Sequence, residues 1–224
     1  MASTKWFDYS FLALGLLIQV VTFYFSNTFQ GVDIGYISLV SGCLGICSVC
    51  LTAQGNILTF VFGFAQVLTY TYLCVAQRFY GEIAINGYYF ITMIYGVYVW
   101  RRRLKGAADG SESKHLVSPR NLSLRAIMFL AVATVLFSWL AGIGLARWTD
   151  DTQPYLDAFT TVPALVAQVL MILVYRNHWY IWLAVDSLSV VLWLRAGDYC
   201  MAAQYAFWCA NCLYGLRRWK ALEQ

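Results

Sequence analysis

Charged residues are scarce in this chain: Lys, Arg, Asp and Glu make up 12% of its 224 residues, whereas 61% are hydrophobic. A soluble domain carries about 25% charged residues, because these wet its surface. The scarcity excludes an ordinary soluble protein and predicts lipid as the solvent for much of the surface. The net charge of +4 comes from basic residues in short runs between apolar stretches, so we expect no nucleic-acid partner.

The chain also lacks the motifs of common enzymes, with no P-loop, no glycine-rich dinucleotide turn and no His-Glu-x-x-His zinc motif. Its two histidines, His115 and His178, stand apart from any carboxylate cluster. The pair Cys209-x-x-Cys212 lies in an apolar run without a second pair or a nearby histidine, which favours packing residues over metal ligands. We therefore expect no catalytic residue, no metal and no cofactor.

Apolar runs long enough to cross a bilayer, which takes about 20 helical residues, are abundant. The pattern predicts eight of them, separated by short polar or turn-forming stretches. Their approximate bounds are Phe7–Phe25, Ile34–Leu51, Asn56–Ala76, Ile83–Trp100, Leu124–Ala146, Leu156–Tyr175, Trp179–Leu194 and Tyr199–Leu216. A longer basic linker, 101–123, divides the chain into halves. The sequence thus predicts an all-α integral membrane protein.

The basic residues predict the orientation of these eight crossings. One side would carry twelve of them: Lys5, Arg101, Arg102, Arg103, Lys105, Lys114, Arg120, Arg125, Arg176, Arg217, Arg218 and Lys220. The other side would carry only Arg78, Arg147 and Arg195. Basic residues concentrate on the cytoplasmic side of membrane proteins, so both termini and the linker are expected there. A seven-crossing alternative would split the basic clusters between the two sides.

The two halves resemble each other. Tyr88-Tyr89-x-x-Thr92-x-x-Tyr95-Gly96 aligns with Phe207-Trp208-x-x-Asn211-x-x-Tyr214-Gly215, at an offset of 214 − 95 = 119 residues. Upstream, 78–82 resembles 195–198 with a small expected shift in offset. An even number of crossings per half predicts two parallel repeats with a substrate site between them, as in many transporters. The frequency of Tyr, Trp and Gly leaves chance similarity as the alternative.

One acidic residue, Asp186, is expected well inside a crossing, where a charge costs at least about 3 kcal/mol and is a functional candidate by default. Trp182 precedes it by four residues and shares its helix face, with Trp179 adjacent. A carboxylate beside indole rings suits a flat organic cation. The alternative is a lone acid bonded to a neighbouring hydroxyl or backbone group, with the tryptophans as interfacial anchors.

Intramembrane amides form a second candidate set, because an unpaired amide in hydrocarbon is costly and must face protein, water or ligand. The fourth segment carries Asn86 and Tyr89, and the eighth repeats this pattern. The remaining candidates, chosen by helix face, are Asn211, Trp208, Tyr214 and Gln204 on the eighth segment and Gln66 and Thr69 on the third. Hydrogen bonds between helices are the alternative for any one of these side chains.

Trp179-x-x-Trp182 and Asn86-x-x-Tyr89, with the echo Asn211-x-x-Tyr214, resemble the motifs of the PnuC-type nicotinamide riboside transporters. The resemblance spans nearly the whole chain, from about Ile34 to Trp219. It implies the fold of the SWEET sugar transporters, with two three-helix bundles and a linking helix (3+1+3). The divisions would be an additional N-terminal helix and loop (1–33), a first bundle (34–100), the linker (101–123), the linking helix and outer loop (124–154) and a second bundle with tail (155–224).

The resemblance also implies function. We expect uptake of nicotinamide riboside by facilitated diffusion across the bacterial inner membrane, through alternating access around a midplane site, and assembly into homotrimers. Relatives of this family that carry thiamine or riboflavin keep a thiamine, vitamin or sugar carrier open as the alternative substrate reading. A membrane receptor or enzyme is the alternative from another class. The short linker offers a receptor little effector surface, and the catalytic motifs of an enzyme are absent.

Overall fold

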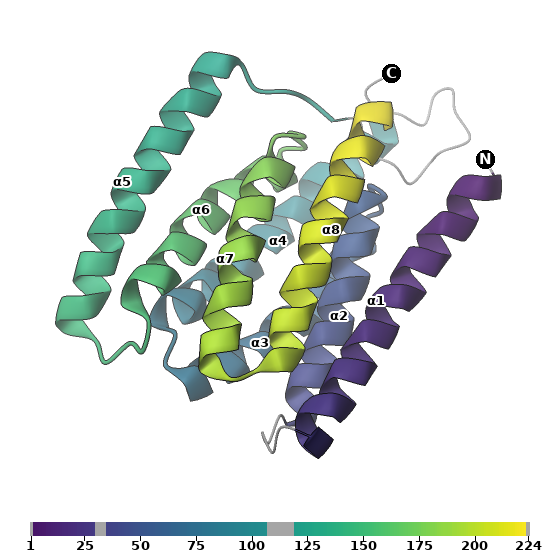
Figure 1. Ribbon diagram of the computed structural model, residues 1–224. Coiled ribbons are helices and arrows are strands. Elements are labelled where there is room, and N and C mark those ends of the chain that lie inside the picture. Colours follow the sequence, from purple (N-terminus) through teal and green to yellow (C-terminus); the bar gives the residue numbers. More distant parts are fainter. Residues whose placement is uncertain (1, 30–34, 107–118, 223–224) are drawn as a thin grey trace.

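The computed structural model describes residues 2–29, 35–106 and 119–222, and this part of the chain is helical with short connections (Figure 1). The helices are α1 (Ala2–Phe29), α2 (Tyr36–Ala53), α3 (Thr59–Gln77), α4 (Tyr80–Gly106), α5 (Leu124–Trp148), α6 (Pro154–Ile172), α7 (His178–Ala196) and α8 (Tyr199–Leu222). The all-α prediction is confirmed for these residues. Helix α4 runs to Gly106, six residues beyond the boundary expected at Trp100.

Local sequence signals account for several helix ends. Ser123 caps α5, where its hydroxyl accepts a hydrogen bond from the backbone N of Ala126 at 3.4 Å. Pro154 begins α6, a position that does not need a backbone N–H. Helices α3 and α7 end in left-handed residues, Arg78 (φ 59°) and Gly197 (φ 80°). This conformation exposes the last carbonyls to new donors and turns the chain back toward the next helix.

The structural repeat has an offset of 119 residues at most helix ends. α3 and α7 begin at 59 and 178 and end at 77 and 196, so both ends differ by 119 residues. The left-handed pair Arg78 and Gly197 has the same offset, so the shift expected around 78–82 does not occur. Helices α4 and α8 begin at 80 and 199, and α2 and α6 end at 53 and 172, again 119 residues apart. The matching helices are therefore α2, α3 and α4 in one half and α6, α7 and α8 in the other.

Six helices form a closed ring. In order around it, α2 packs against α3, α3 against α4, α4 against α6, α6 against α7, α7 against α8, and α8 against α2. Two contacts, α4–α6 and α8–α2, join one half to the other. Helix α1 lies outside the ring against both α2 and α8, whereas α5 packs chiefly on α6 and stands at the edge of the molecule (Figure 1). The α8–α2 contact between the halves is thus covered by α1, whereas no further described helix covers the α4–α6 contact.

The packing of α1 against the ring depends on Gly42 of α2. Gln19 of α1 is fully buried, and its Nε2 donates to the carbonyl oxygen of Cys200 in α8 at 3.0 Å. Its amide lies against Gly42 of α2, where a Cβ would come within 2.0 Å of Nε2. Small residues of this kind let helices approach closely in a membrane, where packing drives association. Gly42 and Gln19 therefore fix α1 across the α2–α8 contact.

Replacing Gly42 with alanine is expected to lower the apparent melting temperature of the purified protein by several degrees. Overpacking of a tight contact costs about 1–3 kcal/mol, and Gln19 is too enclosed to move without losing its hydrogen bond. Gly87→Ala is the matched control, because no atom lies within 4 Å of a Cβ there. The control should match or exceed the wild type, since alanine favours helix by about 1 kcal/mol. Equal melting temperatures for the two variants would contradict this account.

Seven of the described helices, α1 to α7, are long and apolar enough to cross a membrane. α8 is not among them, which differs from the eight apolar crossings expected. The physical reason is that α8 carries polar side chains toward its neighbours and Arg217, Arg218 and Lys220 near its end. It nevertheless runs through the ring between α2 and α7. The start of α1 and the end of α8 lie at one end of the molecule, as an even number of passes requires (Figure 1).

The surface of α5 suits a lipid environment. Only 11% of its membrane window is buried, and its exposed side chains include Phe129, Val132, Phe137 and Leu140. The segment before it, 119–123, docks on the α6–α7 turn, where Arg120 exchanges backbone hydrogen bonds with Val174 and Arg176. Residues 107–118 of the predicted basic linker lie outside the described residues. The domain divisions and the homotrimer stay predictions.

Candidate transport cavity

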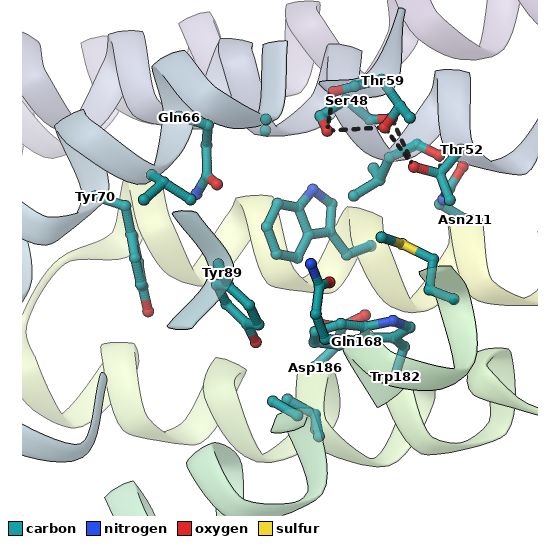
Figure 2. A pocket seen from close by; sticks show the side chains of 18 of the residues that line it. Ser48, Thr52, Thr59, Gln66, Tyr70, Tyr89, Gln168, Trp182, Asp186 and Asn211 are labelled. Carbon is teal, nitrogen blue, oxygen red and sulfur yellow. Dashed lines mark hydrogen bonds between the residues drawn. The ribbon is translucent and has the colours of Figure 1, made fainter. Parts of the chain in front are cut away.

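A cavity lies inside the ring, and all six ring helices contribute to its lining, whereas α1 and α5 contribute no lining residue among those described. Eight of the eleven sequence-predicted site residues line it: Trp182, Asn86, Tyr89, Asp186, Trp179, Asn211, Gln66 and Trp208. Figure 2 shows labelled side chains from Tyr70 at one end of the cavity to Thr52 and Asn211 at the other. The ring topology thus brings polar groups from both halves around one space.

Asp186 presents a carboxylate to this cavity from α7. Its side chain is 2% exposed, and Oδ2 accepts a hydrogen bond from the Cys212 thiol of α8 at 3.3 Å. Oδ1 is buried without a hydrogen-bond partner among the described residues. No Lys, Arg or His is among the described side chains that line the cavity. A buried carboxylate needs compensation, so this oxygen is placed to meet a cation or a hydrogen-bond donor from a solute.

Aromatic rings flank the acid. The ring centroids of Tyr89 and Trp182 lie 6.2 Å apart at an interplanar angle of 52°, and Tyr89, Trp182 and Asp186 are shown together in Figure 2. Trp208 packs edge-on against Tyr205 at 4.8 Å. The Nε1 atoms of Trp179 and Trp208 are buried without partners in the described part of the chain. Aromatic faces attract positive charge, so these rings and Asp186 form a chemically consistent environment for a flat organic cation.

Amides from four helices complete the polar lining, with Gln66 on α3 and the three whose hydrogen bonds follow. Asn211 donates from Nδ2 to the carbonyl of Val49 at 3.1 Å, which leaves its Oδ1 without a partner among the described residues. Gln168 of α6 donates to the Thr92 hydroxyl at 3.3 Å. Asn86 donates from Nδ2 to the carbonyl of Glu82 in its own helix at 2.7 Å. The backbone and side-chain bonds orient these amides, and their remaining acceptors and donors can serve a polar solute.

The end that carries both termini, named the inner end after the expected orientation, has a hydroxyl cluster of Ser48, Thr52 and Thr59 (Figure 2). Thr52 and Thr59 are 2.6 Å apart between hydroxyl oxygens. Beyond the cluster lie two fully buried indoles related by the 119-residue offset, Trp100 and Trp219, with centroids 6.4 Å apart. Trp219 also donates from Nε1 to the carbonyl of Thr52. Large rings from both halves therefore cover the inner end.

A hydrogen-bonded network covers the opposite, outer end. The Tyr70 hydroxyl accepts from Trp193 Nε1 at 3.1 Å and from the Tyr205 hydroxyl at 2.7 Å, and donates to Glu82 Oε2 at 3.3 Å. Thr160 of α6 donates to Glu82 Oε1 at 2.8 Å. These groups come from α3, α4, α6, α7 and α8. The cavity is thus covered by packed indoles at one end and by a polar network at the other.

Outside the network, the outer loops are tied by an exposed ion pair. Arg78 Nη1 lies 2.8 Å from Asp150 Oδ2, and the Tyr80 hydroxyl donates to Asp150 Oδ1 at 2.7 Å. The hydrogen bond from Tyr80, together with the Arg78 charge, lowers the pKa of Asp150 below its ordinary value. Because both partners are well exposed, the ion pair positions the loops and adds little stability.

Three predicted site residues do not line the cavity. The Thr69 hydroxyl donates to carbonyls of its own helix, at Ala65 and Gln66. Gln204 is fully buried against Gly45 of α2. Tyr214 donates to Asp8 of α1 at the inner end, with Arg218 3.6 Å from the same carboxylate. A helix-face argument placed these residues on the polar stripe but did not distinguish the ring interior from the contacts between helices.

Sequence reasoning missed several polar lining residues: Ser48, Thr52, Thr59, Tyr70, Glu82, Gln168, Ser189 and Tyr205. Gln168 carried the same signal as the predicted amides, since it is an amide within an apolar run. The predicted segment bounds leave Glu82 in the polar stretch before Ile83, whereas it lies in the first turn of α4 and is 6% exposed. Hydroxyl residues gave no distinct signal, because Ser and Thr also bond to their own helix.

Comparisons with known proteins agree with this architecture. A family profile described as "Nicotinamide mononucleotide transporter" matches residues 35–221. The nicotinamide riboside transporter PnuC of Haemophilus influenzae is 29% identical, with 97% of this chain and 91% of that protein covered. The corresponding protein of Neisseria mucosa is 28% identical over 96% of this chain and 81% of its own length.

A solved structure supports the fold. The crystal structure of the vitamin B3 transporter PnuC superposes with a TM-score of 0.79 at 28% identity, covering 97% of this chain and 92% of that one. The family match includes seven of the eight described helices, with the whole ring and its cavity. The chain is therefore a multi-pass membrane protein that belongs to the nicotinamide mononucleotide transporter family, as a PnuC-type transporter.

Proposed function

We propose that this protein carries nicotinamide riboside across the bacterial cytoplasmic membrane by facilitated diffusion. The observation that carries the proposal is the cavity inside the ring, where Asp186 has an unpaired buried oxygen beside Trp182 and Tyr89. Relatives that cover nearly the whole chain are named for this substrate. Nicotinamide riboside joins a flat pyridinium cation, a carboxamide and a ribose, and each part has a counterpart in the lining.

The pyridinium ring would lie against Trp182 and Tyr89, whose faces attract positive charge, with the Asp186 carboxylate as the counter-charge. The carboxamide would pair with an amide such as Gln168 or Asn211, since both donate and accept. The ribose hydroxyls would bond to the hydroxyl cluster of the inner end or to Asn86. These groups bind the solute without covalent chemistry, as a carrier requires.

Alternating access would use the two groups of residues that cover the ends of the cavity. The inner indoles and the outer polar network would open in turn, as the halves rock about the cavity that they share. The basic ends of α4 and α8 would face the cytoplasm, because Arg101, Arg102, Arg217 and Arg218 all lie at the end that carries the termini. Assembly into homotrimers belongs to this proposal as the implication of the family.

Uptake into proteoliposomes tests the proposal. Labelled nicotinamide riboside should enter vesicles that contain the protein and appear inside chemically unchanged, with or without ion gradients. A thermal-shift panel with thiamine, riboflavin and nicotinamide mononucleotide should single out nicotinamide riboside, because a ligand that binds the native state raises its apparent stability. A modified product would indicate an enzyme, and a larger shift with thiamine would reassign the substrate.

Trp182→Ala is expected to weaken binding of nicotinamide riboside by about 5- to 30-fold, since a desolvated cation–aromatic contact contributes about 1–2 kcal/mol. Asn86→Ala should weaken it by a smaller factor. Tyr180→Ala is the matched control on α7, because Tyr180 is 58% exposed on the outside of the ring. Titration calorimetry of the three folded variants measures the effect. Unimpaired binding in both cavity variants would remove this site.

A further inference from the structure

Glu82 is the second carboxylate of the cavity, and it stands at its outer end. Among the lining residues that the structure describes, only Glu82 and Asp186 are acidic. Glu82 precedes Asn86 by four residues and Tyr89 by seven, so the three follow one another along one face of α4. Tyr70 and Tyr205 line the cavity beside it. The outer end thus repeats the combination of carboxylate and aromatic rings found deeper at Asp186.

The carboxylate of Glu82 has neutral partners. Its two oxygens accept hydrogen bonds from the hydroxyls of Thr160 and Tyr70. The basic residue nearest in sequence, Arg78, is exposed and pairs with Asp150 instead. Neutral hydroxyl donors offset the burial of a carboxylate less completely than a cation would. The outer end therefore favours a cation as the partner of Glu82, and the residues around Glu82 do not supply one.

Glu82 bridges the contact between α4 and α6, and this contact is suited to separation. Thr160 and Asp157 belong to α6, and Asp157 accepts hydrogen bonds from the backbone N atoms of Gly81 and Glu82 at 2.7 and 3.1 Å. This α4–α6 contact is held at its outer end by polar groups that water or a solute can replace. The equivalent α2–α8 contact is covered by α1, whereas α5 packs chiefly on α6. Separation of the halves at the outer end is therefore easier between α4 and α6.

We propose that Glu82 is a specificity-determining residue of uptake, whose carboxylate exchanges the Thr160 hydroxyl for a cationic solute as α4 separates from α6. The inference rests on the proposed transport of nicotinamide riboside and adds a recognition step at the outer end, before the solute reaches Asp186. Selection for positive charge then occurs twice along the path, at Glu82 on arrival and at Asp186 in the cavity.

Initial uptake rates in cells without another transporter for this substrate test the inference. Nicotinamide riboside is compared with its dihydro form, which has the same shape but no ring charge. Glu82→Gln should raise KM for the cation by about tenfold and leave KM for the neutral form nearly unchanged, because glutamine can still bond to Thr160 and Tyr70. Glu82→Asp should retain the preference for the cation.

Asp198→Asn is the matched control. Asp198 is a buried carboxyl at the outer end of α8 that accepts from Ser38 and from the Met201 backbone but does not line the cavity. Asp198→Asn should not change the ratio of the KM values for the charged and neutral forms. An equal rise of both KM values in Glu82→Gln would mean that Glu82 only holds the helices together, and would overturn the inference. Failure of the wild type to bind nicotinamide riboside would instead overturn the proposed function.

Discussion

Asp186→Asn is expected to weaken binding of nicotinamide riboside by about 100-fold, while binding of the neutral dihydro form changes by no more than about threefold. The variant keeps the shape of the side chain and removes its charge. Loss of one partner from a buried charge pair costs about 2–5 kcal/mol, which corresponds to 30-fold or more in affinity. The neutral form loses no such pair, so the difference between the two ligands isolates the charge.

Titration calorimetry with both ligands measures this difference in purified protein. Asp150→Asn is the control, because Asp150 lies in an exposed outer loop and pairs with Arg78 away from the cavity. Cys212→Ser should retain the preference for the cation, since a hydroxyl can replace the thiol that donates to Asp186 Oδ2. Equal losses for the charged and neutral ligands in Asp186→Asn would mean that the carboxylate does not recognise the ring charge.

The parts of the fold that were predictable are those that depend on local composition. Apolar runs gave the helices, and the basic runs gave an even number of passes, which fits the termini at one end of the molecule (Figure 1). The similarity of 88–96 and 207–215 gave the repeat and its offset. Asp186 was predictable because an acid inside an apolar run has few structural reasons to be there.

The parts that were not predictable depend on contacts between distant segments. Glu82 follows Arg78 in a stretch that reads as a polar loop, and only the packing of α6 on α4 buries it. Tyr214 follows Asn211 on the polar face of α8, but α1 supplies Asp8 as its partner. The place of α1 could not be deduced, since only the folded chain shows that α1 packs against both α2 and α8. Tertiary contacts thus decided which polar residues face the cavity.

The cavity itself arises from a difference between the repeats. At the 119-residue offset, Trp182 of α7 corresponds to Gly63 of α3, and both positions line the cavity. One half contributes an indole, whereas the other contributes no side chain at all. A large side chain at 63 would extend from α3 into the cavity beside Met93 and Ser48. The absence of a side chain at Gly63 therefore makes room for a ring-shaped solute between two otherwise similar bundles.

Side chains of increasing size at position 63 should weaken ligand binding progressively. A Cβ at Gly63 would lie 3.0 Å from the Met93 sulfur and 3.3 Å from the Ser48 hydroxyl, so Gly63→Ala needs only a small shift of a flexible methionine. Gly63→Val and Gly63→Leu extend further into the cavity. We expect a loss of affinity of about threefold for alanine and of more than 100-fold for leucine, because the ligand and the new side chain compete for one volume.

The measurement must separate blocked binding from misfolding. Each variant is purified, and its apparent melting temperature is recorded with and without nicotinamide riboside, since a bound ligand raises it by mass action. Gly63→Leu should melt near the wild-type temperature and lose the ligand-induced rise, because its side chain extends into the cavity once the flexible Met93 has shifted. Gly87→Ala, with no atom within 4 Å of the new Cβ, should keep both the wild-type melting temperature and the ligand-induced rise. A ligand-induced rise that survives in Gly63→Leu would show that the solute binds elsewhere, since leucine and the ligand cannot share the space beside Gly63.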